Sequence, residues 1–402
     1  MKIAILGPIN KNDFHPLIKK KELKRLPNGH GVSPISNLAI SLLELGHEVS
    51  VITLSPDIKG SKNFVYKNKR LKIYFCQLRH RWLRFFGLLY GKEINNLKKA
   101  IQQDNPEIIH ANWIYEYAFA TYNSKKKYIL TNHDVPHVIL RHQKTLIRLI
   151  RFFMGYISLK RAKIITTPSK YAKLQTKKYT KKPIYVIPNT AIEKKLLTFK
   201  IKEKKINKKI KIVMLNNGFS PFKNIKIALK SFKEFNKFSP NSSLHLFGYQ
   251  MQNGEVPGTN RGSQACYIWA KKNNLHKNVI FNGHVQHVDL IKILHKYDVL
   301  LHTSLEETFG TIYIEAMIKG VPIIAGKKSG STPEIIKNNG LLVDVKKSEE
   351  IIKALKKYLQ NPNLWKKIRY KAYYNAKSIY NNETIVKEYL KLYKKVLKNP
   401  NT

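Results

Sequence analysis

Short apolar stretches alternate with helix-length segments along the chain, and this alternation restricts the fold more than any other feature. It opens with a strand at Lys2–Leu6, a glycine-containing loop, and a segment at 32–45 with apolar residues at helical spacing. Gly46 is expected to end this helix, because a residue with positive φ commonly caps a helix C-terminus, and a strand follows at 49–54. A strand, a helix and a second strand in this order predict a parallel sheet.

The same pattern occurs twice, on either side of a charged tract at 191–209. We therefore predict an N-terminal domain at 1–190, a linker at 191–209, a second domain at 210–380, and a C-terminal helix at 381–402 that packs back toward the first domain. The expected fold class is α/β, with two Rossmann-like, doubly wound domains. Ligands of such sheets bind at the carboxyl ends of the strands, so two sheets facing each other would share a central cleft. The further strands are expected at 72–75, 108–110, 128–131, 163–167 and 184–187, and then at 210–215, 243–247, 279–282, 299–303, 323–325 and 341–343.

The composition of the chain indicates the cellular location of the protein and the class of partner that it binds. The 402 residues include two cysteines, which cannot form a disulfide framework, and we find no signal peptide and no long apolar run. A cytoplasmic location is expected. The formal net charge of +49 favours an anionic partner, although a lysine-rich composition also accounts for part of this charge.

The segment from Glu306 to Met317 carries the strongest chemical signal. It follows an expected strand, and its loop leads through Gly310 into a helix that contains Glu315. The amides of Phe309, Gly310 and Thr311 would lie at the helix N-terminus, where the helix dipole and unpaired N–H groups favour an anion such as a diphosphate. Glu307 in the loop and Glu315 in the helix can accept hydrogen bonds from sugar hydroxyls, although two glutamates at this spacing are also common on solvated surfaces.

This string, with Gly320-Val-Pro-Ile-Ile-Ala and Ser329-Gly-Ser-Thr-Pro-Glu after it, resembles the donor-binding half of the retaining glycosyltransferases of family 4, which have the GT-B fold. The resemblance extends to Gly29-His-Gly31, Thr131-Asn-His133 and Val186-Ile-Pro-Asn189 in the first half. It implies that Gly31 lies beside the donor diphosphate and that His133 lies near the transferred sugar. It further implies that Glu307 contacts donor sugar or phosphate, that Glu315 contacts the ribose, and that Val285 lies near the base.

One position departs from the family pattern. The family has an arginine before a loop that ends in lysine; here Lys223 matches the lysine and Gly218 occupies the arginine position. Gly218 supplies an amide without a charge, so neutralisation of the diphosphate would depend on Lys223, the helix dipole and, as a weaker candidate, Arg261 in a glycine-rich tract. The expected catalytic residues are His133, Glu307 and Lys223, because a cation stabilises the leaving phosphate and a carboxylate offsets oxocarbenium charge.

A metal cofactor is not expected. The sequence contains no Asp-x-Asp motif, whose carboxylates hold the divalent ion of GT-A enzymes, and no His/Cys cluster at zinc spacing. His133 and Asp134 resemble a metal pair, but we interpret His133 as a residue of the cleft. The nucleotide-sugar is therefore expected to be the co-substrate, with no cofactor.

Two basic and aromatic segments, at 79–90 and 141–161, are candidates for contact with an anionic membrane. In the second, Arg141, Lys144, Arg148 and Arg151 would share one helix face, and Leu146, Leu149, Phe153 and Ile157 another. The alternative is that the apolar stripe packs on the sheet and the basic stripe is solvated.

We thus predict a metal-independent hexosyltransferase that moves a sugar from a UDP or GDP sugar to a glycan or lipid-linked acceptor in bacterial surface polysaccharide synthesis, cytoplasmic or peripheral on the inner membrane face. One alternative is a GT-B enzyme of other chemistry, such as a nucleotide-sugar epimerase. A second is a basic nucleic-acid-binding protein, although the charge is spread over both halves and no specific nucleic acid is expected. A third is a non-catalytic partner subunit.

Overall fold

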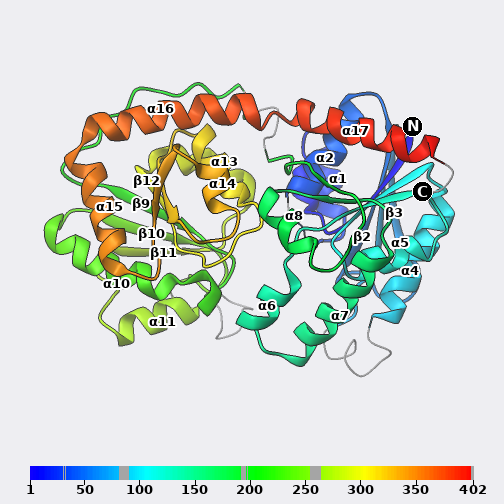
Figure 1. Ribbon diagram of the computed structural model, residues 1–402, viewed down its shortest axis with the longest axis horizontal. Coiled ribbons are helices and arrows are strands. Elements are labelled where there is room, and N and C mark those ends of the chain that lie inside the picture. Colours follow the sequence, from blue (N-terminus) through cyan, green and yellow to red (C-terminus); the bar gives the residue numbers. More distant parts are fainter. Residues whose placement is uncertain are drawn as a thin grey trace. The chain divides into compact units, whose positions relative to one another are not determined.

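The computed structural model describes residues 1–29, 31, 33–80, 90–191, 196, 198–253 and 264–399. The chain divides into two compact units, of which unit 1 comprises 1–193 and 380–402 and unit 2 comprises 194–379 (Figure 1). Each unit is an α/β domain built on its own sheet. The chain therefore leaves unit 1 once, forms unit 2, and returns to unit 1 for its last helix.

Unit 1 contains an eight-stranded sheet in the order β3-β4-β2-β1-β5-β6-β7-β8, as far as the described residues show. All neighbouring pairs are parallel except β3 and β4. The order reverses between β1 and β5, which places the crevice typical of doubly wound sheets at the carboxyl ends of these two strands. The strands are β1 (Lys2–Leu6), β2 (Glu48–Ser55), β3 (Phe64–Asn68), β4 (Leu71–Gln77), β5 (Ile108–Asn112), β6 (Tyr128–Thr131), β7 (Ile165–Thr167) and β8 (Ile184–Val186).

Helices cover both faces of this sheet because its central strands are apolar on both sides. In β1, Ile3 and Ile5 belong to one core cluster, which includes side chains of α2 and α17. Ala4 and Leu6 belong to another, which includes side chains of α4 and α5. Such two-sided burial is typical of parallel sheets. The helical elements of unit 1 are η1 (Lys11–Phe14), α1 (Lys20–Arg25), α2 (Ser33–Glu44), α4 (Gly91–Asp104), α5 (Glu116–Tyr122), α6 (Pro136–His142), α7 (Leu146–Arg161), α8 (Lys170–Thr176) and α17 (Asn382–Lys398).

Unit 2 contains a six-stranded, all-parallel sheet in the order β11-β10-β9-β12-β13-β14, again among the described residues. Here the order reverses between β9 and β12. The strands are β9 (Lys211–Leu215), β10 (Ser243–Phe247), β11 (Val279–Gly283), β12 (Val299–His302), β13 (Ile323–Gly326) and β14 (Gly340–Val343). The helical elements are η2 (Pro221–Lys223), α10 (Ile225–Phe238), α11 (Ala265–Lys272), α12 (His287–Ile293), η4 (Leu294–Lys296), α13 (Thr311–Ile318), α14 (Thr332–Ile336), α15 (Ser348–Gln360) and α16 (Pro362–Ile379).

The fold class agrees with the sequence prediction of two doubly wound α/β domains, and three local features differ from it or add to it. Residues 64–68 form β3, an antiparallel edge strand that the sequence analysis did not identify. Within the tract 191–209, which we expected to be a linker, Ile206 is buried in the core of unit 2. The segment 141–161 is not one helix, because α6 ends at His142 and α7 begins at Leu146.

The split between α6 and α7 corrects the predicted basic face. Arg141 and Lys144 are exposed, whereas Arg151 points into unit 1, with its guanidinium 3.9 Å from the centre of the Tyr115 ring and 3.9 Å from Glu116. The buried face of α7 includes the small residues Gly155 and Ser158. The predicted apolar stripe faces outward and does not pack on the sheet. Its side chains are 56% exposed for Leu146, 39% for Leu149, 54% for Phe153 and 38% for Ile157.

Candidate active site

Most of the predicted donor-binding residues lie at the carboxyl ends of β9 and β12, where the strand order of unit 2 reverses. The loop after β9 contains Gly218 and leads to Lys223 in η2. The loop after β12 contains Glu307 and leads to α13. The two loops contact each other, since the amide of Leu305 donates to the carbonyl of Phe222 at 2.9 Å. The topology of the sheet therefore brings residues about 90 positions apart into one site.

Lys223, His302 and Glu307 form a polar cluster at this place. The Lys223 ammonium lies 2.8 Å from Oε1 of Glu307, and Nε2 of His302 lies 3.0 Å from the same oxygen. Lys223 also donates to the Ser304 hydroxyl at 3.3 Å. Burial raises the pKa of Glu307, but the Lys223 charge and the His302 contact outweigh burial and hold this pKa well below its usual range. Glu307 is therefore a carboxylate at neutral pH.

The first turn of α13 begins at Gly310, which has a φ of +74°. A Cβ at this position would lie 2.3 Å from the Tyr313 ring, so only glycine fits the turn. Phe309 is 2% exposed, and its ring belongs to the buried interior rather than to a binding surface. Gly310 and Thr311 are half-buried at the helix N-terminus, where backbone N–H groups and the helix dipole favour an anion.

Glu315 lies on the second turn of α13 and is 3% exposed. Its Oε1 is 2.7 Å from Nε2 of His287, the first residue of α12. A buried carboxylate is costly unless it is paired, and His287 supplies that pairing. This contact fixes the position of the Glu315 carboxyl group on α13.

The remaining donor residues lie on neighbouring loops. Gly218 has a φ of +99°, and the amide of Phe219 beside it donates to the Gln250 side chain at 2.8 Å. Val285 is half-buried after β11, next to His284, whose ring stacks on Tyr249 at 4.3 Å between centroids. Arg261 lies outside the residues that the structure describes.

Two predicted residues belong to unit 1. Gly31 packs so closely on Ile9 that a Cβ would lie 1.6 Å from its backbone carbon, which accounts for the glycine. His133 is the second residue after β6, and its Nε2 lies 2.9 Å from Oδ1 of Asn112 at the end of β5. Burial lowers the pKa of His133 to about 4, so the ring is neutral at pH 7.

Four residues of these sites were not predicted from the sequence, namely Asn112, His287, His302 and Ser304. His302 is the last residue of β12 and lies five residues before Glu307. Its place beside the loop that contains Glu307 could have indicated it. His287 is 28 positions from Glu315, and only the fold brings the two together. In the described part of the chain, no group of three or more histidine, cysteine or acidic side chains is arranged to hold a metal ion.

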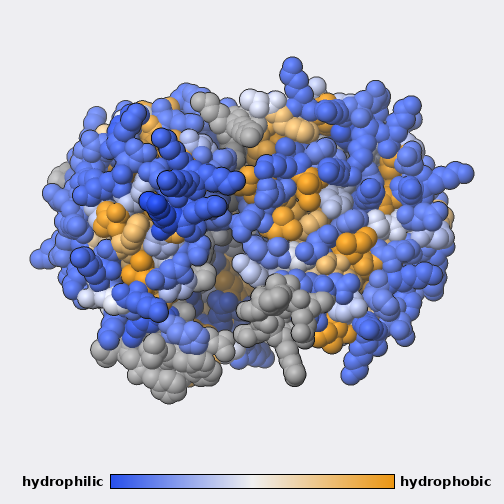
Figure 2. Space-filling model, turned by 180° about the vertical axis from the view of Figure 1, so that it is seen from behind, coloured by the Kyte–Doolittle hydropathy of each residue, from blue (hydrophilic) through white to orange (hydrophobic). Residues whose placement is uncertain are grey.

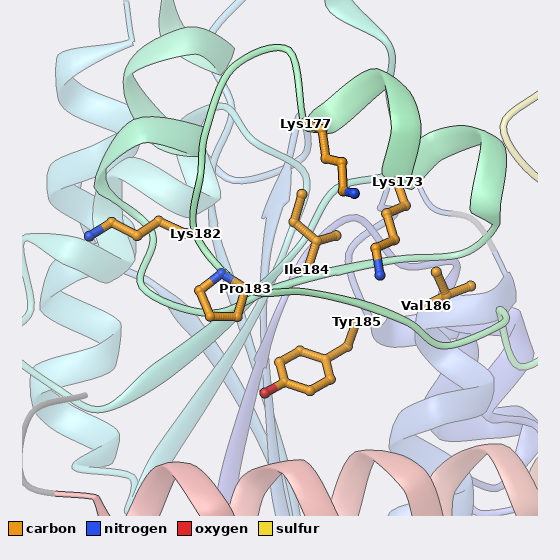
Figure 3. A pocket seen from close by; sticks show the side chains of 7 residues that line it. All are labelled: Lys173, Lys177, Lys182, Pro183, Ile184, Tyr185 and Val186. Carbon is orange, nitrogen blue, oxygen red and sulfur yellow. The ribbon is translucent and has the colours of Figure 1, made fainter.

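Hydrophilic residues dominate the face in Figure 2, and hydrophobic residues form only small patches on it. A hollow of about 560 Å³ lies beside the edge strand β8 in unit 1, and none of the residues described above lines it. It is lined by Lys173, Lys177 and Lys182 together with Pro183, Ile184, Tyr185 and Val186 (Figure 3). Lysine and proline are common at sheet edges, where they hinder pairing with another strand, so we assign no ligand to this hollow. No helix among the described residues is long and apolar enough to cross a membrane.

Comparison with known proteins identifies the fold and the family. Over nearly its whole length the fold resembles that of solved GT-B glycosyltransferases. A sucrose-phosphate synthase from Thermosynechococcus elongatus superposes with a TM-score of 0.75 at 18% identity, covering 98% of both chains. Anabaena HepE in complex with UDP superposes with a TM-score of 0.64 at 15% identity, covering 98% of this chain and all of that one. The protein thus has the GT-B fold.

Two family models identify the family. The model described as Glycosyltransferase Family 4 matches residues 34–191, and the model described as Glycosyl transferases group 1 matches residues 198–375. The chain therefore belongs to the group 1 glycosyltransferases of family 4. A similar curated protein is N-acetyl-alpha-D-glucosaminyl L-malate synthase from Bacillus anthracis, which is 25% identical over 382 residues and covers 90% of this chain and 93% of its own.

Proposed function

We propose that this glycosyltransferase moves a hexose-type sugar from a UDP or GDP sugar to a glycan or lipid-linked acceptor, with retention of the anomeric configuration and without a metal ion. The observation that carries the proposal is the cluster of Lys223, Glu307 and His302 beside the N-terminus of α13. It combines a fixed cation, a carboxylate and backbone amides at the topological switch point of unit 2.

Each component suits one part of the reaction. Breaking the bond between the anomeric carbon and the diphosphate builds negative charge on the leaving oxygen, which Lys223 and the amides at Gly310 would stabilise. The sugar gains positive charge at the same time, and the Glu307 carboxylate can offset it. Glu315, held by His287, would accept hydrogen bonds from the two ribose hydroxyls.

The likeness to HepE, whose structure is described as a complex with UDP, supports a uridine nucleotide as the first donor to test. The stacked pair of Tyr249 and His284 lies beside Val285, the residue assigned to the base, and offers an aromatic surface there. The B. anthracis synthase, named for a product that joins an amino sugar to malate, widens the acceptors to test from glycans to small hydroxy acids.

A thermal-shift screen of UDP, GDP, ADP and CMP sugars in EDTA tests this function, because a ligand that binds only the native state raises the melting temperature. The stabilising donors are then incubated with acceptors, and the product anomer is assigned by NMR. Transfer with retention in EDTA is expected. Release of an epimerised nucleotide sugar with no transfer would favour the epimerase alternative, and a requirement for Mg²⁺ would contradict the metal-independent mechanism.

We also propose that unit 1 contacts an anionic membrane surface through α7, as a glycosyltransferase with a lipid-linked acceptor in surface polysaccharide synthesis would. Leu146, Leu149, Phe153 and Ile157 form an exposed apolar stripe on this helix, and Lys160 and Arg161 at its end are exposed cations. Apolar residues flanked by basic ones are typical of interfacial helices, and each cation near such a surface contributes about 1 kcal/mol.

Flotation with vesicles rich in phosphatidylglycerol tests this contact. The double variant L146S/F153S should lose most of the bound fraction at physiological salt. The control I268S/Y374S removes two side chains of unit 2 that are 52% and 63% exposed, and it should bind like the wild type. Equal flotation of both variants, or none by the wild type, would refute the role of α7.

A further inference from the structure

The ends of β5 and β6 in unit 1 are held by a buried polar network. His110 of β5 bonds the Tyr393 hydroxyl of α17 through Nδ1 at 2.7 Å and the Thr131 hydroxyl of β6 through Nε2 at 2.5 Å. Burial lowers the pKa of His110 to about 3, so this ring is neutral as well. The network fixes the two strands side by side, and each continues into a residue of interest: Asn112 lies two positions after His110, and His133 two positions after Thr131.

The amide of Asn112 has one favourable orientation. Its Nδ2 lies 3.3 Å from the carbonyl of Leu6 and 3.4 Å from the carbonyl of His110, and its Oδ1 lies 2.9 Å from Nε2 of His133. Exchanging oxygen and nitrogen would place Oδ1 against two carbonyl oxygens, which are also acceptors. The two carbonyls therefore direct the oxygen of Asn112 toward His133.

This orientation determines the tautomer of His133. An amide oxygen only accepts, so Nε2 of the neutral ring must carry the proton, and Nδ1 carries the lone pair. Among the described residues, no group bonds Nδ1. Trp113, the first residue after β5, has a φ of +69°, which is rare for a bulky side chain, and such strain is frequent at functional sites.

We propose that Asn112 is a positioning residue that fixes His133 with its proton on Nε2, so that Nδ1 accepts a hydrogen bond from a hydroxyl of the transferred sugar. The inference depends on the proposed function for the identity of the ligand, but the tautomer itself does not. It predicts specificity, because a site built to bond a hydroxyl rejects an analogue that lacks it.

Nitrogen-15 NMR of the histidine rings tests the tautomer without any substrate, with the His133 signals assigned from their loss in H133Q. At pH 7 the wild type should show a protonated Nε2 and an unprotonated Nδ1. N112L should lose it through exchange between tautomers. The control N96L removes another buried amide of unit 1 and should leave the His133 signals unchanged.

Turnover tests the role in catalysis with the donor found above. N112L should lower kcat/KM by roughly fivefold to tenfold for the complete sugar, the effect of one lost hydrogen bond. It should have no effect with the single deoxy donor that lacks the bonded hydroxyl. A wild-type His133 protonated on Nδ1, N112L signals identical to the wild type, or an equal loss with every deoxy donor would overturn the inference. Absence of transfer from any donor would refute the proposed function instead, and the NMR result would stand.

Discussion

Replacing Lys223 with methionine removes the cation of the proposed site and keeps most of its aliphatic stem. The Lys223 ammonium and the Glu307 carboxyl lie 2.8 Å apart, and their side chains are 19% and 18% exposed, so water screens the pair only partly. Loss of one charged or polar donor to a leaving oxyanion costs about 3 kcal/mol of transition-state stabilisation, or roughly 100-fold to 1,000-fold in kcat. We expect K223M to lose activity to this extent.

The assay is the initial rate of nucleoside diphosphate release at saturating donor, with the melting temperature measured in parallel. K230M removes an equal charge from the exposed surface of α10 and should keep wild-type kcat. If K223M is folded and its kcat stays within threefold of the wild type, Lys223 does not stabilise the leaving group, and the assignment of the cluster fails.

Three further predictions follow from the same geometry. The pKa of Glu307 is lower in the folded protein than the value of 4.5 in the unfolded chain. The ionised carboxylate therefore contributes its full stabilisation above pH 4.5, and this contribution is lost as pH falls below that value. Urea unfolding midpoints should fall more steeply below pH 4.5 in the wild type than in E307Q. The pKa of His133 is about 4 in the folded protein and 6.5 in the unfolded chain. The wild type should therefore lose stability relative to H133Q as pH falls from 6.5 to 4. An equal dependence of the unfolding free energy on pH in both proteins would contradict the buried neutral ring. G310A should lose about 2 kcal/mol or more of stability through backbone strain and the clash with Tyr313. Gly60 also has a positive φ, but a Cβ there would meet nothing within 4 Å, so the control G60A should lose only about 1 kcal/mol. Equal melting temperatures of the two variants would refute the clash.

Much of the fold follows from local sequence patterns. The strands near β9, β10 and β12 are short apolar runs between helix-length segments, and their predicted bounds agree with the structure to within a residue or so. Strand β3 was not predicted because its sequence, Phe-Val-Tyr-Lys-Asn, lacks a continuous apolar run. An edge strand whose residues are exposed or only partly buried does not need one. The interruption between α6 and α7 escaped prediction because neither proline nor glycine marks it.

The candidate site was only partly predictable for a different reason. Glu307, Gly310 and Glu315 lie on one continuous segment, and the residue types there indicate a loop and a helix N-terminus. The pairing of Glu315 with His287, and of His133 with Asn112, joins residues from different strands and helices. Such contacts depend on strand order and register, and one sequence does not specify these through local periodicity.

Binding of nucleoside diphosphates to the wild type and to E315Q, measured by calorimetry in EDTA, tests the central claim most directly. The wild type should bind one of UDP, GDP or ADP without metal, and E315Q should bind it roughly tenfold more weakly, because one charged acceptor for the ribose is lost. Equal affinity of both proteins, or binding only when Mg²⁺ is added, would contradict the assignment of the donor site to unit 2.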